Sequence, residues 1–455
     1  MVVACLAAIG GGAVALAVWQ WLAFSSLDWF FSFNPRAVTE WRRAVGLGAV
    51  GDRPPVAPSV YTAVFRALLI EMWLAYAVLL LRVRVDSGRP LPPPPAARQV
   101  LRVAIPMVAL VALVAPPLLS TDVFAYVGYG RLAVVHHLNP HLYTQADLLS
   151  RGDPTTPYLH WPIASPYGPL WTIVSMLVVR VAPAGAIVGP VVALKLLGGA
   201  ALVVVALLAG RLARDLDGDP RRADGVFAAT IANPILLLEG PGNAHNDLAM
   251  MAAVLGAMAL LARGRFRGAA ALAGVAAAVK LMPLMMVPWL AVAAARARMA
   301  APPRERRWPA ALGAGASVVA LAMAPVVAAY APFWSGLRTL AGLGSRWQSG
   351  SGLGTAPVAL GAIAWNVAPL AVALGALSLW AILAPPGEAA KRAVTAWAWA
   401  ALAILLFAAG VWYPWYLVWI WPVVLIRANL PHRLLAALIM AFGVFLTLVY
   451  TVVSF

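Results

Sequence analysis

The chain has very little cysteine and very little charge for its length. Of its 455 residues only Cys5 is a cysteine, and only 11% are Asp, Glu, Lys or Arg. A single cysteine excludes an intrachain disulfide and a cysteine metal site. So few charged residues exclude an ordinary water-soluble domain, whose surface carries charge throughout. Hydrophobic residues are abundant instead, at 63% of the chain.

Apolar runs long enough to cross a membrane recur along the whole sequence. A crossing helix needs about 20 predominantly apolar residues, and residues 2–24, 62–81, 191–210 and 434–453 are examples of such runs. No soluble domain of useful size remains between the runs. We therefore predict an all-α integral membrane protein with one polytopic domain over residues 1–455, and we interpret the first run as a retained anchor.

Basic residues outnumber acidic ones by 33 to 16, for a formal net charge of +17. The arginines form short clusters between apolar runs rather than one continuous stripe, so we expect topology determinants and no nucleic acid. If every cluster is cytoplasmic, an even number of crossings separates neighbouring clusters. This parity predicts about 13 transmembrane helices, with the N-terminus inside and the C-terminus outside. The clusters lie at residues 82–102, 211–222, 263–267, 296–307, 391–392 and 427–433.

Two regions need separate treatment for this count. Residues 167–183 are barely long enough to cross, so we predict an interfacial helix within one large external loop over residues 120–185. Residues 267–296 are too long for one span and short for two, which predicts two short helices bent around Lys280 and Pro283.

The expected organisation has three parts. Residues 1–100 hold two N-terminal spans and a cytoplasmic proline-rich loop. Residues 101–430 form the core with the large first external loop, and residues 431–455 form the last span.

Asp122 stands at the outer end of the third predicted span. A carboxylate at a membrane boundary suits a general base acting on a hydroxyl group. The alternative is structural: Ser120, Thr121 or Asp122 is the N-cap of an interfacial helix over residues 123–136. The residues alone leave both interpretations open.

A second polar cluster, residues 239–247, fills a tight Gly/Pro turn between two spans. Its two carboxylates, histidine and two asparagines exceed what a helix hairpin needs. The alternative is an N-cap for the next span, provided by Asn246 or Asp247. His245 and Asp247 lack a third ligand nearby in sequence, so the spacing gives no metal signature. We expect no metal ion and no cofactor.

Three charged residues, Glu71, Lys195 and Lys280, fall within apolar spans, where charge is costly and therefore indicates function. Lys195 is near the outer end of its span, so we expect its amine to reach the interface. Lys280, at the predicted bend, is the better candidate to bind the phosphate of an anionic lipid.

Aromatic and basic residues at the outer boundary complete the candidates. Arg346 lies beside Trp347, a pair that suits contact with a phosphate and a sugar ring. Trp415 and Tyr416 also lie at an outer boundary, where stacking on a sugar and an ordinary aromatic belt explain them equally well.

Taken together, these segments resemble the actinobacterial polyprenol-phosphate-mannose-dependent α-1,6-mannosyltransferases, within the GT-C class of membrane glycosyltransferases. The resemblance extends over about residues 100–430. Each motif is weak alone, but their order and their predicted membrane sides agree with the family. The motifs are residues 120–126, 139–143, 165–170, 242–247, 279–283, 344–347 and 414–416.

The resemblance implies a GT-C-like helical bundle that moves a mannosyl residue, with inversion, from a polyprenyl-phosphate donor to a glycan or glycolipid acceptor. An aspartate at the start of the first external loop is the usual base of this class, and it corresponds to Asp122. The resulting substrate-binding candidates are Tyr126, Arg131, Tyr167, Glu239, His245, Asn246, Asp247, Lys280, Arg346, Trp347, Trp415 and Tyr416.

Two alternatives remain open from the sequence. One is the same chemistry with another polyprenyl-phosphate sugar, such as arabinofuranose or glucose. The other is a transporter or flippase of lipid-linked sugars. We favour the enzyme, because transporters show repeat symmetry and mid-membrane carboxylates, whereas these carboxylates gather at one face. The expected location is the cell membrane, with the active site on the extracytoplasmic side.

Overall fold

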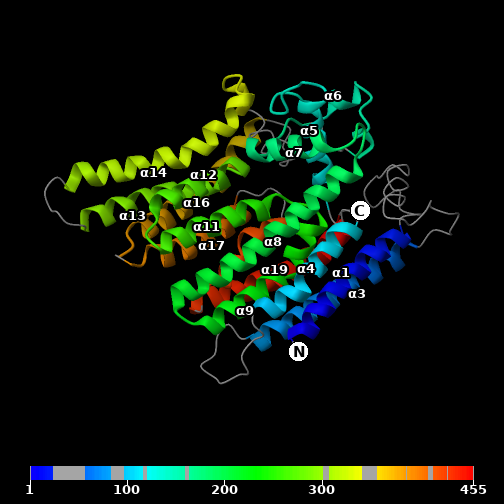
Figure 1. Ribbon diagram of the computed structural model, residues 1–455, viewed down its shortest axis with the longest axis horizontal. Helices are drawn as coiled ribbons and strands as arrows, with labels where there is room; N and C mark the ends of the chain where they lie inside the picture. The colour runs from blue at the N-terminus through cyan, green and yellow to red at the C-terminus, as the bar shows by residue number, and fades with distance from the viewer. Residues whose placement is uncertain are drawn as a thin grey trace.

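The computed structural model forms a helical bundle (Figure 1). Within the residues described, the chain forms helices and turns and no β-strand. Arg346, Trp347 and the proline-rich stretch 90–95 lie outside the described residues. The described residues are 2–23, 57–83, 97–115, 120–158, 163–300, 307–340, 356–385, 387–407, 413–427 and 429–453.

The N-terminal helices lie along one edge of the bundle (Figure 1). Helix α1 (Val2–Ala23) packs against α3 (Pro58–Val83) and α4 (Ala97–Val114), and α3 also contacts the last helix, α19 (Leu430–Val453). Large apolar side chains of α3, such as Leu81 at 66% exposure, point outward. Apolar side chains on the outer surface of a long apolar helix match a lipid environment.

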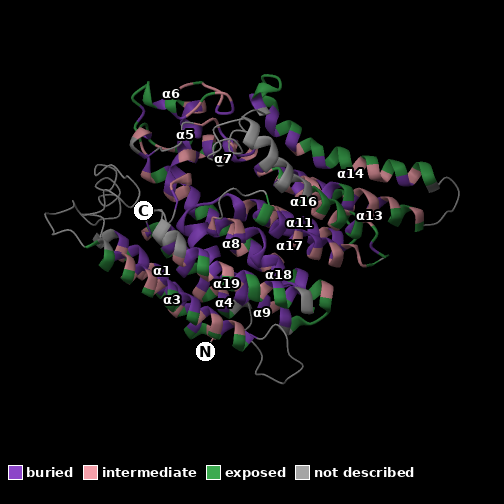
Figure 2. Ribbon diagram, turned by 180° about the vertical axis from the view of Figure 1, so that it is seen from behind, coloured by how far each residue is buried: buried purple, intermediate pink, exposed green. Residues whose placement is uncertain are grey.

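The long helices of the core pack through small side chains. Helix α12 buries a row of alanines, including Ala269 and Ala273, which lets neighbouring helices approach closely. Figure 2 shows that α11 and α17 are largely buried and that α8 is about half buried, whereas α14 exposes side chains along its length. The helices of the core are α8 (Val188–Asp217), α9 (Pro220–Ile231), α11 (Asp247–Ala262), α12 (Phe266–Val279), α13 (Met286–Ala300), α14 (Arg307–Tyr330), α16 (Ala356–Ile382) and α17 (Ala389–Phe407).

The region predicted as a large external loop forms short elements at one end of the bundle (Figure 1). They are α5 (Asp122–Val134), α6 (Ala146–Leu149), η2 (Thr156–Tyr158) and α7 (Pro169–Val181). At about 1.5 Å per residue, α7 is about 20 Å long, short of the roughly 30 Å hydrocarbon core. Its length therefore agrees with a helix that does not cross alone, and its orientation to the membrane stays a prediction.

The remaining short elements interrupt or follow the long helices. They are α10 (Pro234–Leu237), the π-helical turn η3 (Leu238–Gly242), η4 (Met282–Met285), η5 (Ala331–Phe333), η6 (Arg338–Leu340), η7 (Pro414–Trp419) and α18 (Trp421–Val424). The predicted break around Lys280 and Pro283 is confirmed, because α12 ends at Val279 and α13 begins at Met286.

Five helices within the described residues are long and apolar enough to cross a membrane: α1, α3, α8, α14 and α17. The number rises to six if the bent pair Pro234–Gly242 and Asp247–Ala262 is one span. Several further apolar helices are shorter. The chain is therefore a helical membrane protein, and the count of about 13 spans stays a prediction.

The expected exposure of Lys195 is wrong. Its side chain is completely buried in α8, and its ammonium group donates a hydrogen bond to the carbonyl of Ala115, just after α4. Burial of an amine requires such an acceptor. Lys195 therefore joins two helices instead of extending to the interface.

Candidate active site

Asp122 occupies the first turn of α5 and does not cap it. The N-cap residue is Thr121, which makes no side-chain capping bond. The Asp122 N–H donates to the hydroxyl of Ser120 at 3.1 Å, whereas the Asp122 carboxylate accepts a 2.7 Å hydrogen bond from the hydroxyl of Tyr167. The N-cap alternative for Asp122 is therefore not what the structure adopts.

The segment around Tyr167 links Asp122 to the end of α12. The N–H of Gly168 donates to the carbonyl of Val279 at 2.9 Å, directly before Lys280 in sequence. The Tyr167 ring contacts the buried Tyr126 ring edge-on, at 4.8 Å between centroids. Tyr126 thus supports Tyr167 from within the core.

A distorted turn aims the second polar cluster toward Asp122. The axis of the chain bends by 116° between Pro234–Gly242 and α11, and Ala244 has a φ of +60°. That conformation is strained for alanine. The turn is held by a hydrogen bond of 2.9 Å from the His245 N–H to the Glu239 carbonyl. A Cβ at Gly198 would lie 2.6 Å from the Gly240 carbonyl, so α8 can approach this turn only with glycine there.

His245 lies between two carboxylates. Its Nδ1 is 3.8 Å from Asp122 Oδ2, and its Nε2 is 3.4 Å from Glu239 Oε2. Trp415 stacks on the imidazole at 4.4 Å and also on Tyr413 at 4.1 Å. With Trp415 itself only 4% exposed, this packing fixes the plane of the His245 ring.

Asp247 and Lys280 form an ion pair beside this cluster. Lys280 Nζ is 2.5 Å from Asp247 Oδ1, and the indole of Trp419 donates to the same oxygen. The Lys280 ammonium also lies 5.5 Å from the centroid of the Trp419 ring, within the range of a cation–π interaction. The pair therefore couples η7 to α11 and to the break after α12.

The three clustered carboxylates differ in accessibility. The side chain of Asp122 is 13% exposed, whereas those of Glu239 and Asp247 are at most 1% exposed. Glu239 also accepts a 2.7 Å hydrogen bond from Asn243. A molecule outside the protein can therefore reach the carboxylate of Asp122 and the ammonium of Lys280, whose side chain is 16% exposed.

Asn246 is completely buried beside this cluster. Neither its carbonyl oxygen nor its nitrogen makes a hydrogen bond within the described part of the chain, and the residue has no exposed surface. Burying an unpaired amide costs about 1–3 kcal/mol. Such a cost next to the Asp122 cluster is typical of a residue kept for a ligand.

The structure does not bring every predicted residue into this cluster. Arg131 instead forms a buried ion pair with Asp153, with both Nε–O distances at 3.0 Å, and His136 lies 2.7 Å from the same carboxylate. Tyr416 packs against Trp419 and Tyr413 at the edge of the cluster. The substrate-binding roles predicted for Arg131 and Tyr416 stay predictions.

The ion pair of Arg131 predicts a strong stability effect. Asp153→Asn leaves a buried guanidinium without its counter-charge, which typically costs 3–5 kcal/mol. We expect a markedly lower thermal unfolding temperature in detergent. Asp147→Asn is the milder control, because Asp147 lies in α6 and makes a part-buried contact with Thr144. An unchanged unfolding temperature for Asp153→Asn would contradict the structural role.

The pH dependence of this ion pair has a defined sign. Burial raises the pKa of Asp153, but hydrogen bonds from Arg131, Thr155 and His136 outweigh it and hold the pKa below its ordinary value. The folded state therefore binds this proton less readily than the unfolded chain does. The stabilisation is present above the ordinary aspartate pKa of about 3.9 and is lost as the pH falls through the lower folded value.

Two partners in the cluster were not predicted, Trp419 and Asn243. Trp419 lies in a segment with several tryptophans, and nothing in its spacing distinguishes it from its neighbours. Asn243 was part of the polar turn, and its distance of four residues from Glu239 is the signal that identifies the contact. No group of three or more His, Cys, Asp or Glu side chains suited to a metal ion occurs within the described residues.

Fold and site together define a helical membrane protein with a carboxylate–histidine–lysine cluster where several helices end. Residues 29–296 match the family model described as alpha-(1->6)-mannopyranosyltransferase, N-terminal domain. The match covers more than half of the chain and includes Asp122, Tyr167, the 239–247 turn and Lys280. The chain therefore belongs to the alpha-(1->6)-mannopyranosyltransferase family, a family of glycosyltransferases. Neither the curated proteins nor the solved structures give a match.

Proposed function

We propose that the chain transfers a mannosyl residue from a polyprenyl-phosphate donor to a glycan or glycolipid acceptor, at the extracytoplasmic face of the membrane. The observation that carries this proposal is the accessible Asp122 carboxylate in a cluster whose other carboxylates are buried. Membership in a mannosyltransferase family indicates that the transferred sugar is mannose. A membrane-embedded helical enzyme suits a donor that is itself a lipid.

The chemistry needs one base and one anion-binding group. Asp122 takes the proton of the acceptor hydroxyl, and the oxygen attacks the anomeric carbon of the mannosyl residue. The bond from that carbon to the phosphate oxygen breaks, and the polyprenyl monophosphate leaves with the electron pair. A single displacement inverts the anomeric centre, so a β-linked donor gives an α-linked product.

The leaving phosphate is assigned to Lys280. The ammonium is partly exposed and stands at the break between α12 and α13. Its ion pair with Asp247 holds it in place but also neutralises it, so the incoming phosphate must compete with that carboxylate. Preorganised cations of this kind stabilise charge that develops in the transition state. Arg346 remains the second proposed phosphate contact.

The donor experiment tests this function directly. Membranes that contain the protein are supplied with radiolabelled polyprenyl-phosphate mannose and oligomannoside acceptors. We expect transfer from this donor, and none from a nucleotide-linked mannose that is supplied to purified protein in liposomes without polyprenyl phosphate. Donors that carry arabinofuranose or glucose are the matched comparison, and preferential use of either would replace the mannosyl assignment. Movement of the intact lipid-linked sugar without transfer would indicate a flippase.

Tyr167→Phe is expected to lower turnover by roughly tenfold. The substitution removes a hydrogen bond to a charged group, worth about 1.5–3 kcal/mol, and keeps the ring contact with Tyr126. The measurement is initial rate at saturating donor. Tyr129→Phe is the control, because its hydroxyl donates to the Ile163 carbonyl at 3.0 Å and not to Asp122. Equal rates for both variants would argue against a role for Tyr167 in positioning Asp122.

The proposed side of the membrane predicts a labelling pattern. Arg214, half exposed near the end of α8, lies in a cluster assigned to the cytoplasm. In a Cys5→Ala background, we expect Arg214→Cys to react with an impermeant thiol reagent only after the cells are opened. Labelling of intact cells would place this cluster outside and reverse the proposed topology.

A further inference from the structure

A cavity of about 450 Å³ lies between α12, α13 and α14, at the end of the bundle away from α5–α7. Two kinds of residue line it. Arg265, Arg267 and Arg298 provide positive charge, and small apolar residues such as Ala294 and Val318 provide the wall. The cavity therefore combines cations with an apolar surface.

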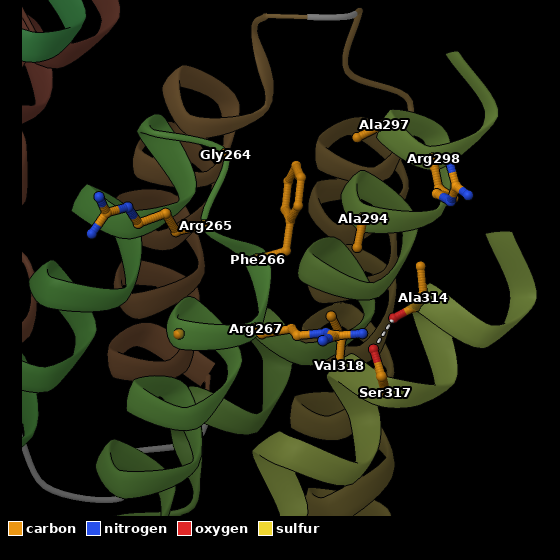
Figure 3. Close-up of a pocket in the computed structure, with 11 residues that line it drawn as sticks. Gly264, Arg265, Phe266, Arg267, Ala294, Ala297, Arg298, Ala314, Ser317 and Val318 are labelled. Atoms are coloured by element: carbon orange, nitrogen blue, oxygen red, sulfur yellow. Dashed lines mark hydrogen bonds between the residues drawn. The ribbon is translucent and has the colours of Figure 1, made fainter. Parts of the chain in front are cut away.

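Two of the arginines, Arg267 and Arg298, flank the cavity. Figure 3 shows Arg267 extending from α12 toward Ser317 and Val318 of α14, with Arg298 on α13, whereas Arg265 points another way. Neither Arg267 nor Arg298 makes a hydrogen bond or an ion pair within the part of the chain that the structure describes. Nearby Arg263 differs, because it pairs with Asp215 at 2.8 Å.

The apolar surroundings indicate a lipid rather than a free ion. Next to the arginines, the Phe266 ring stands within the cavity (Figure 3). On α14, Leu312 is 70% exposed and Trp308, near the start of the helix, is 67% exposed. An exposed tryptophan near the end of an apolar helix is typical of the membrane interface. The arginines therefore lie beside exposed apolar side chains of the kind that contact lipid, an arrangement suited to a lipid head group.

We propose that this cavity binds an anionic phospholipid, with its phosphate at Arg267 and Arg298 and an acyl chain along the apolar wall that Ala294 and Val318 form. Arginine suits phosphate because its planar guanidinium donates several hydrogen bonds. Arginines that only determine topology need no cavity between helices, and here a cavity is present. The site is remote from Asp122 and takes no part in the proposed transfer.

Lipid titration of the purified full-length protein, followed by native mass spectrometry, tests this site. Phosphatidylglycerol is compared with zwitterionic phosphatidylcholine and with soluble glycerol phosphate. We expect phosphatidylglycerol to stay bound, phosphatidylcholine to bind much more weakly, and glycerol phosphate not to be retained. Arg267→Gln and Arg298→Gln should each weaken the binding of phosphatidylglycerol about fivefold, which is the effect of one arginine near an anionic lipid surface.

Arg211→Gln is the matched control. Arg211 is an exposed arginine of α8 outside the cavity, so its loss should change binding by less than about twofold. Equal weakening by all three substitutions, or retention of glycerol phosphate as tight as phosphatidylglycerol, would overturn the proposal. A photoactivatable phosphatidylglycerol on the wild-type protein serves if a variant fails to fold. Crosslinks to residues 294–298 or 314–318 support the site, and crosslinks confined elsewhere refute it.

Discussion

Asp122→Asn is expected to reduce mannosyl transfer by at least about 100-fold, the lower end for loss of a general base. The amide keeps the shape of the carboxylate and still accepts the hydrogen bond from Tyr167, but it cannot take a proton at neutral pH. Because Asp122 follows the N-cap residue Thr121 and is not itself the N-cap of α5, little stability should be lost. The measurement is turnover at saturating donor, on detergent-extracted protein shown to be monodisperse.

The control for Asp122 comes from the same cluster. Asp247→Asn removes a carboxylate that is fully buried and paired with Lys280, so it should lower stability, because the Lys280 ammonium loses its counter-charge. The two variants therefore differ in kind: Asp122→Asn loses turnover while it stays folded, whereas Asp247→Asn loses stability. If Asp122→Asn kept near wild-type turnover, Asp122 would not be the base, and Glu239 or Asp247 would be the next candidates.

Gly168→Ala is expected to have the largest structural effect among single-methyl changes near the site. A Cβ there would lie 2.2 Å from the carbonyl oxygen of Ala278 and 2.7 Å from that of Val279. Backbone must move to accept it, at a cost typical of overpacking, about 1–3 kcal/mol. The movement separates Tyr167 from Asp122 and shifts Lys280, so we expect transfer to fall about tenfold, which corresponds to about 1.4 kcal/mol of lost transition-state stabilisation.

Gly189→Ala is the companion substitution for Gly168→Ala. Gly189 lies in α8, and a Cβ there meets nothing within 4 Å. It should leave both transfer and the unfolding temperature near wild type. If Gly168→Ala behaves like Gly189→Ala, then α7 and the end of α12 are not in the close contact on which the proposed site depends.

The sequence predicted the cluster where chemistry and topology agreed. Asp122 and His245 each lie at the end of a predicted span, and the positions of the arginine clusters predict that both ends are on the same side of the membrane. In the structure His245 Nδ1 lies 3.8 Å from Asp122 Oδ2. The common cavity expected around them goes beyond that contact and stays a prediction. The break at Lys280 was predictable because one apolar run was too long for a single helix and carried a proline.

Tertiary contacts over long sequence distances were not predictable. Trp419 reaches Asp247 across 172 residues, and a tryptophan-rich segment gives no sign of which indole will donate. Lys195 was expected to reach the interface because it lies near the outer end of its span. Its position in the sequence could not show that the carbonyl of Ala115 accepts its hydrogen bond. Arg131 pairs with Asp153 through an irregular segment, where no helical or strand periodicity fixes which residues meet.

The most direct test of the account is the anomeric configuration of the product. The purified protein, reconstituted in liposomes, is given a β-linked mannosyl phosphate donor on a polyprenyl chain and an oligomannoside acceptor, and the new linkage is analysed by NMR spectroscopy. We predict an α-linked mannosyl residue, formed by the wild type and absent with Asp122→Asn. A β-linked product, or α-linked product formed equally well by Asp122→Asn, would contradict a single displacement with Asp122 as the base.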